Sequence, residues 1–176
     1  MAQFCKAFDK TFANEGGLKL TNIKGDKGGL TFAGISRVYW PKWDGWELID
    51  KGDKGSPELV GRVRQFYRAH FWTPIKGDDI KSDEIAGTVY DFAVNGGVAP
   101  AVKLAQLTCG CAPDGVMGPA TLARLNLMTD KEFSDIYALQ KMRHYAHICN
   151  DNHDQSKFLL GWVNRTLTMA GLDPWK

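Results

Sequence analysis

The sequence predicts an α+β domain that is predominantly α-helical, with one small β-hairpin near the N-terminus. Apolar residues recur at helical spacing over most of the chain. The segment between residues 18 and 33 instead combines short apolar runs with glycine-rich turn residues, which is typical of a hairpin. The chain has 176 residues and 44% of them are hydrophobic, so it is long enough for one domain with a substantial core.

The N-terminal part predicts a helix followed by the hairpin. Phe4, Phe8 and Phe12 lie four residues apart and form one apolar stripe. The glycines at 16 and 17 should end this helix, because glycine readily adopts the left-handed conformation at a helix end. Residues 18–23 and 30–32 are expected to form the two strands, with the turn between them at 24–29.

The remaining residues are expected to be mostly helical. A short helix and then an aromatic-rich loop are expected over residues 34–50. Ser56 followed by proline and glutamate predicts a helix start, and that helix should continue to about residue 71. Thr129 and Glu132 form a capping box ahead of a long helix over 130–149. Further helices are expected over 82–97, from Pro100, from Pro119 and over roughly 155–170.

Composition excludes several classes of protein. The net charge of +2 and the pI near 8.3 are too weak to favour nucleic acid as a partner. No apolar run approaches the roughly 18 residues that a bilayer-spanning helix needs, so no membrane insertion is expected. Charged residues in the first ten positions argue against a signal peptide. Another component would then have to deliver the protein to any site outside the cytoplasm.

Three polar residues near the N-terminus are candidates for chemistry. Glu15 lies at the end of an apolar helix, where partial desolvation would raise its pKa and suit it to general-acid work; it could equally be a solvated glutamate. Asp26 could be a second carboxylate facing it, as glycoside hydrolysis requires, or an ordinary turn residue. Thr31 could hold a water molecule beside Asp26, or simply favour a strand.

No other cluster in the sequence predicts a cofactor or metal site. His144 and His147 are three residues apart on a predicted helix, but their spacing matches no strong metal signature. Surface or core histidines are the expected interpretation. We therefore expect neither a metal ion nor a cofactor.

The order of the short motifs resembles the glycoside hydrolase family 108 N-acetylmuramidases, a lysozyme-like group common in phages and prophages. The N-terminal motifs are Glu15–Gly17, the D-x-G-G-x-T pattern of Asp26–Thr31, and Gly34–Ser36. The second half resembles the family's C-terminal, peptidoglycan-binding region in Tyr90–Gly97 and Asp114–Leu122. The resemblance covers roughly residues 5–165.

The resemblance implies a lysozyme-like fold and hydrolysis of the β-1,4 bond between N-acetylmuramic acid and N-acetylglucosamine. It implies that Glu15 is the general acid. By looser similarity to phage-type lysozymes, Asp26 would position or activate water and Thr31 would assist. Members of the family often have proline after the aspartate, whereas this chain has Lys27. We expect one lysozyme-like domain over 1–176, with a catalytic lobe at about 1–90 and a helical, peptidoglycan-binding-like lobe at about 91–176.

The resemblance also suggests substrate contacts and partners. Trp40 belongs to an aromatic cluster that could stack on sugars or form a local core. Tyr90 and Asn95 are expected on a helix that faces the cleft in lysozyme-like folds. The expected partner is bacterial peptidoglycan. The protein is expected to be a bacterial or phage-encoded monomer that stays in the cytoplasm until a holin releases it. The alternatives are a lytic transglycosylase, which forms a 1,6-anhydro product without water, and a non-catalytic wall-binding or secretion-accessory protein.

Overall fold

A computed structural model describes residues 2–14, 17–22 and 29–172. Most of these residues are helical, and the strands are confined to positions 20–36, so the expected fold class is confirmed. The α-helices are α1 (Phe4–Asn14), α2 (Gly45–Asp50), α3 (Pro57–Tyr67), α4 (Asp83–Gly96), α5 (Val98–Thr108), α6 (Pro119–Leu125), α7 (Asp130–Asp151) and α8 (Leu159–Met169). A π-helical turn extends α3 (η1, Arg68–Trp72), and 3₁₀ turns lie at Gly77–Asp79 (η2) and His153–Phe158 (η3).

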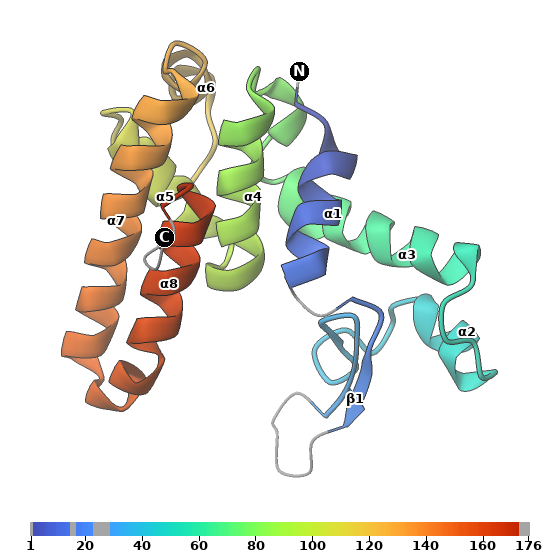
Figure 1. Ribbon diagram of the computed structural model, residues 1–176. Coiled ribbons are helices and arrows are strands. Elements are labelled where there is room, and N and C mark those ends of the chain that lie inside the picture. The colour runs from blue at the N-terminus through green and yellow to red at the C-terminus, as the bar shows by residue number, and fades with distance from the viewer. Residues whose placement is uncertain (1, 15–16, 23–28, 173–176) are drawn as a thin grey trace.

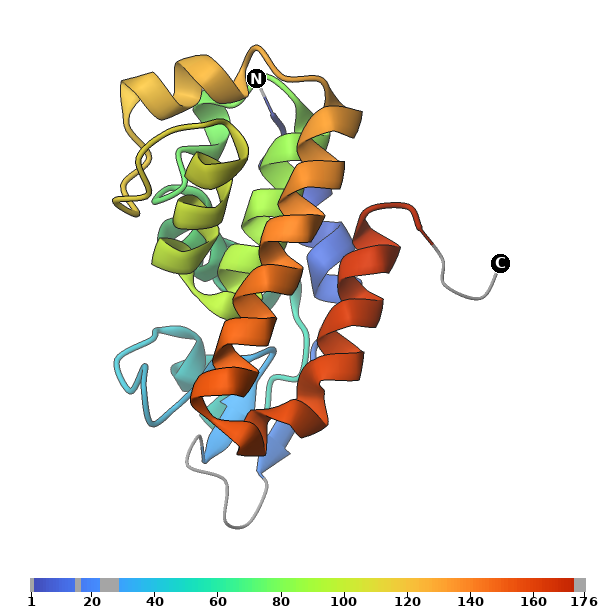
Figure 2. The ribbon, with the colours of Figure 1, turned by 90° about the vertical axis from the view of Figure 1, so that its left-hand side faces the viewer.

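The helices form two groups that meet along α4. Figure 1 shows α7 and α8 side by side at one edge of the molecule, and the small sheet and α2 at the other. Helices α1 and α4 pack together between these groups, and α4 also contacts α5 and α7. In Figure 2, the lower ends of α7 and α8 reach the level of the sheet, and the lower part of α7 lies in front of it.

The phenylalanine stripe of α1 packs into an aromatic core, as its spacing predicts. Phe4 lies with its ring centroid 5.6 Å from that of Trp72 and 5.9 Å from that of Tyr90. Phe8 stacks on Phe12, with ring centroids 4.9 Å apart. Aromatic pairs at these distances add to the stabilisation from burial, so α1 is fixed rigidly against α4 and the end of α3.

Helix starts follow the predicted caps. The hydroxyl of Ser56 accepts the N–H of Leu59 at 3.1 Å and begins α3. The hydroxyl of Thr129 accepts the N–H of Glu132 at 3.2 Å and begins α7. Each cap satisfies one backbone donor that would otherwise lack a partner in the first turn.

The sheet has three antiparallel strands rather than the two that were expected. Strands β1 (Leu20–Asn22) and β2 (Leu30–Phe32) form the predicted hairpin, and β3 (Ile35–Ser36) adds to the free edge of β2. Thr31 pairs with Thr21 on one side and with Ser36 on the other, so it lies in the central strand. The prediction missed β3 because a strand of two residues leaves almost no periodic signal.

A buried tyrosine fixes the tight turn between β2 and β3. Ala33 and Gly34 both have positive φ, 51° and 79°, which is the geometry of a type I′ hairpin turn. The hydroxyl of Tyr67, on α3, donates to the carbonyl of Ala33 at 2.8 Å. A Cβ at position 34 would lie 2.5 Å from that hydroxyl, so glycine is required there. The central strand is thus anchored directly to the helical core.

Two other predicted boundaries were wrong in detail. In residues 34–50 the order is reversed: the aromatic loop comes first and the short helix α2 follows at Gly45–Asp50. Helix α5 begins at Val98, two residues before Pro100. The N-terminal end of a helix tolerates proline because its first backbone N–H groups have no partner within the helix. Gly97 alone joins α4 to α5, with a φ of 91° that side-chain-bearing residues rarely adopt.

Candidate active site

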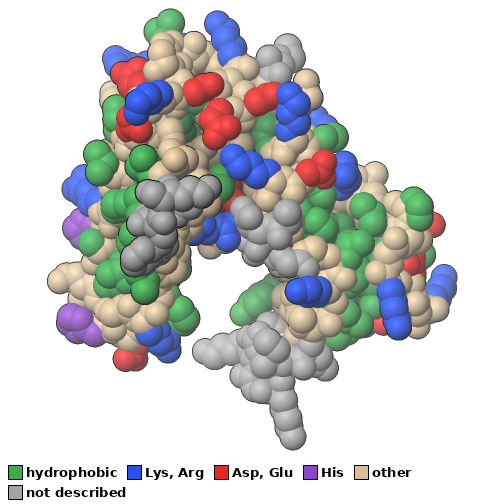
Figure 3. Space-filling model, in the orientation of Figure 1, with side chains coloured by type: hydrophobic (Ala, Val, Ile, Leu, Met, Phe, Trp, Pro, Cys, Tyr) green, Lys and Arg blue, Asp and Glu red, His purple; other side chains and the backbone are tan. Residues whose placement is uncertain are grey.

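A deep notch separates the C-terminal helices from the sheet. Figure 3 shows this notch between the lower part of the α7–α8 pair and the lobe that contains the sheet and α2. In Figure 1, both α1 and α4 end at the top of the notch. The last described turns of both helices therefore lie close to a space that an extended polymer could enter.

The predicted catalytic carboxylates, Glu15 and Asp26, lie outside the described residues. Helix α1 is described to Asn14, and the chain is described again from Gly17, whose N–H donates to the carbonyl of Phe12 at 3.2 Å. Gly17 has a φ of 74°, in agreement with the predicted helix end. The roles of Glu15 and Asp26 therefore stay predictions.

Thr31 is placed in the central strand of the sheet, and its side chain is half-buried. Its hydroxyl has one long hydrogen bond, in which Oγ1 donates to the carbonyl of Gly29 at 3.4 Å. Because a hydroxyl oxygen can also accept hydrogen bonds, the oxygen of Thr31 can still accept one from water. The predicted role of Thr31 is compatible with this position and stays a prediction.

A buried ion pair links three helices at the top of the notch. The carboxylate of Asp91 on α4 is only 3% exposed, and Nη2 of Arg165 on α8 donates to it at 2.8 Å. The hydroxyl of Thr11, on α1, donates to the same carboxylate oxygen at 3.3 Å. A buried carboxylate requires such partners, because leaving it unpaired would cost several kcal/mol. The network holds α8 against the last turns of α1.

A second buried cation, Lys141 on α7, also faces Asp91. Burial lowers the pKa of Lys141 to about 8, and the Asp91 carboxylate partly opposes this shift, whereas the charge of Arg165 adds to it. The ammonium group lies 5.9 Å from the ring centroid of Phe92 and 5.8 Å from that of Tyr137. These aromatic faces supply some of the stabilisation that the buried charge loses by leaving water.

Tyr90 is a core residue, so the substrate contact predicted for it does not fit the structure. Its side chain has 0% exposure, and its ring packs edge-on against Phe4 and Trp72. Burial raises the pKa of its hydroxyl well above the usual value. The prediction was wrong because position 90 lies on the side of α4 that packs on Phe4 of α1 and on Trp72.

Asn95 is exposed near the C-terminal end of α4. Its side-chain amide donates to the carbonyl of Asp91 at 2.7 Å, which is one turn earlier in the same helix. That bond uses one of its two amide hydrogens, and the other hydrogen and the side-chain oxygen can meet a ligand. The predicted binding role of Asn95 thus stays a prediction.

Trp40 lines an aromatic pocket of about 350 Å³ beside the sheet lobe. The pocket is formed by Tyr39, Trp40, Pro41, Lys42, Trp43, Phe66 and His70. Trp40 remains 39% exposed, while its ring centroid lies 4.2 Å from that of His70 and 5.0 Å from that of Phe66. Burial lowers the pKa of His70, which favours the uncharged ring. The cluster is thus both a local core and an accessible aromatic surface.

Nothing in the described part of the chain gathers metal ligands. No group of three or more His, Cys, Asp or Glu side chains converges among residues 2–14, 17–22 and 29–172. No helix described in the structure is long and apolar enough to cross a membrane.

Sequence analysis missed the network around Asp91. An aspartate between valine, tyrosine, phenylalanine and alanine in a helix is a signal for a buried charge, because such a position faces apolar neighbours. Its partner Arg165 lies 74 residues later, and no local pattern connects them.

Comparison with known proteins gives the class and the family. The "Structure of Brucella abortus SagA" matches with a TM-score of 0.69 and 26% identity, over 96% of this chain and 91% of that chain. None of the curated protein sequences compared with the chain matches it. Residues 8–97 match the family described as "Glycosyl hydrolase 108", and residues 100–167 match the "Predicted Peptidoglycan domain".

The fold and these matches make the protein a glycoside hydrolase. It belongs to the glycosyl hydrolase 108 family, and its second match supports peptidoglycan as its partner. The two matched regions meet at the junction of α4 and α5, between residues 97 and 100.

Proposed function

We propose that the protein is an N-acetylmuramidase that hydrolyses the β-1,4 bond between N-acetylmuramic acid and N-acetylglucosamine. The observation that carries the proposal is the family match over residues 8–97, which contains Glu15 directly after the rigid helix α1. The match to a peptidoglycan domain supports the wall polymer as substrate.

In this mechanism Glu15 protonates the leaving glycosidic oxygen. A glycosidic bond breaks through a transition state with positive charge on the sugar, so it needs an acid on one side and a carboxylate on the other. Asp26 would supply the second carboxylate and position the attacking water. Thr31 would accept a hydrogen bond from that water, since it lies on the central strand and follows Asp26 by five positions in the sequence.

The products of wall digestion test this proposal. Hydrolysis adds water, so released muropeptides should carry ordinary reducing ends. A lytic transglycosylase would instead release 1,6-anhydro products, each lighter by one water. Mass spectrometry of muropeptides from purified sacculi separates the two. Binding to sacculi without any released muropeptide would favour the third possibility, a non-catalytic wall-binding or accessory protein.

Trp40 and Asn95 are proposed as sugar contacts. Trp40 presents an exposed indole in a pocket, and the faces of aromatic rings suit the apolar faces of pyranoses. Replacing Trp40 with Ala should weaken binding of N-acetylglucosamine oligomers about tenfold, a loss of roughly 1.4 kcal/mol. Calorimetric titration measures this, with Tyr39→Phe as the matched control because it keeps an aromatic ring in the same pocket. Unchanged affinity in Trp40→Ala would remove Trp40 from the binding site.

The cellular setting belongs to the same proposal. We propose that a monomer with a catalytic lobe at about 1–90 and a helical lobe at about 91–176 acts as an endolysin, kept in the cytoplasm until a holin releases it. Its support is the resemblance to phage and prophage enzymes. Appearance of the intact protein outside living cells, without lysis, would contradict this route.

A further inference from the structure

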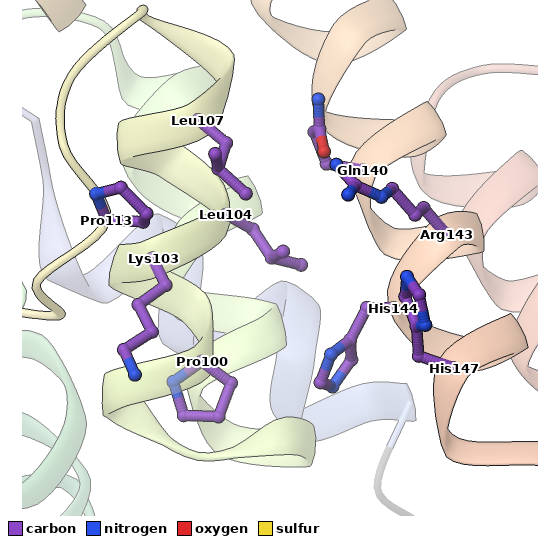
Figure 4. Close-up of a pocket in the computed structure, with 9 residues that line it drawn as sticks. All are labelled: Pro100, Lys103, Leu104, Leu107, Pro113, Gln140, Arg143, His144 and His147. Atoms are coloured by element: carbon purple, nitrogen blue, oxygen red, sulfur yellow. The ribbon is translucent and has the colours of Figure 1, made fainter. Parts of the chain in front are cut away.

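A groove between α5 and α7 lies apart from the aromatic pocket and has different chemistry. Its volume is about 550 Å³, which is within the range of small-ligand sites. It is lined by Pro100, Lys103, Leu104, Leu107, Pro113, Gln140, Arg143, His144 and His147. Figure 4 shows the leucines of α5 facing the side chains of α7 across the groove.

The groove is lined by cationic side chains and by no acidic one. None of the residues that line it is Asp or Glu. Arg143 is exposed and has no ion-pair partner or hydrogen bond among the described residues. In Figure 4 its guanidinium points into the groove near Gln140. Lys103 is a weaker candidate, because it faces the carboxylate of Asp114.

The groove also contains a polar atom without a partner. The amide oxygen of Gln140 is buried, and no group in the described part of the chain donates to it. Buried acceptors are normally satisfied, so one without a donor beside an open groove points to a ligand that brings an N–H.

We propose that this groove binds the acidic stem peptide of peptidoglycan. Arg143 would pair with a peptide carboxylate, Gln140 would accept a peptide N–H, and Leu104 and Leu107 would contact alanine methyl groups. This inference rests on the proposed function, because it takes the wall polymer as the ligand.

The chemistry of the groove favours the peptide over the glycan. The glycan backbone of peptidoglycan is uncharged where its lactyl groups are linked to peptide, so it offers nothing for Arg143 to pair with. Sugars are better matched by the tryptophan and tyrosine rings at the pocket around Trp40. The two sites therefore suit the two components of one polymer.

The histidines of the groove add a dependence on pH. Burial, and secondarily the neighbouring charge of His147, lower the pKa of His144 below its usual value. His144 also contacts the rings of Phe92 and Tyr145, which carry no charge at neutral pH. Its ring is therefore mostly neutral at pH 7 and gains charge as the pH falls. Binding of a carboxylate ligand should strengthen with that gain.

Calorimetric titration with a synthetic stem tetrapeptide (L-Ala, D-isoglutamate, diaminopimelate, D-Ala) tests the inference. The wild type should bind it, and Arg143→Glu should weaken binding by about tenfold or more, since it places like charges together. Leu107→Asp is a second variant at an exposed position of the groove and should weaken binding similarly. Arg124→Glu is the matched control: it reverses an exposed arginine in the same half of the chain, outside the groove, and should bind as the wild type does.

Several outcomes would overturn the inference. These are no binding of the tetrapeptide by the wild type, equal affinity in Arg143→Glu and the wild type, or displacement of the tetrapeptide by N-acetylglucosamine oligomers. Thermal unfolding of each variant checks that it is folded. The Glu15→Gln variant separates the two proposals, because it should bind the tetrapeptide at the wild-type affinity. If the wild type binds the tetrapeptide but does not hydrolyse purified peptidoglycan, only the proposed function is lost.

Discussion

Replacing Glu15 with Gln is expected to reduce wall hydrolysis by a factor of about 10²–10⁴, the usual contribution of a general acid. The amide has nearly the same size and cannot give up a proton at neutral pH. Substrate binding should change little, so the loss should be in kcat rather than in KM. The decrease in turbidity of purified peptidoglycan, followed at several substrate concentrations, measures both constants.

The matched control for this variant is Glu47→Gln. Glu47 is an exposed glutamate in the first turn of α2, and it is neither one of the proposed catalytic residues nor one of the residues that line the aromatic pocket. It should keep the wild-type rate. If Glu15→Gln clears peptidoglycan as fast as Glu47→Gln, Glu15 is not the general acid, and the assignment by resemblance fails.

Replacing Asp91 with Ala is expected to lower the free energy of unfolding by about 3–5 kcal/mol, the typical result of removing one partner of a buried ion pair. Arg165 would lose the carboxylate of Asp91, and Lys141 would lose an acid that opposes the lowering of its pKa. Urea unfolding, followed by circular dichroism, measures the change. Asp135→Ala removes an exposed ion pair with Lys131 instead and should change stability by only a small fraction of that amount.

The pH dependence of stability gives a second readout for Asp91→Ala. The folded pKa of Lys141 is about 8, below its ordinary value of 10.5, so between these values the unfolded chain binds a proton that the folded chain has lost. The contribution of Lys141 to the free energy of unfolding therefore rises as the pH increases from about 8 to 10.5. Removing Asp91 lowers the folded pKa further, and the rise should begin at a lower pH. A variant whose stability differs from that of the wild type by the same amount at about pH 7 and about pH 9 would contradict this account.

Local sequence signals predicted those parts of the molecule that depend on local physics. The four-residue spacing of Phe4, Phe8 and Phe12 predicted α1 and its buried face, and Ser56 and Thr129 predicted helix starts to the residue. These features depend on contacts between residues a few positions apart.

Contacts between distant residues could not be predicted in the same way. The pairing of Asp91 with Arg165 and the placing of Tyr67 under the β2–β3 turn join residues 74 and 34 positions apart. Tyr90 was assigned to the wrong face of α4 because that helix is buried on most sides, which leaves no polar face to orient it. The groove between α5 and α7 likewise exists only after the helices pack. The site prediction thus depended on the motif order rather than on derived geometry.

The ion pair between Asp91 and Arg165 connects the two regions that match known families. Asp91 belongs to the region that matches the hydrolase family, whereas Arg165 belongs to the peptidoglycan region. A chain divided at Gly97 would separate a buried carboxylate from its counter-charge and expose the face of α4 that α5 and α7 cover. The region that matches the peptidoglycan domain therefore supports the fold of the region that matches the hydrolase family, and we expect neither to keep its full stability without the other.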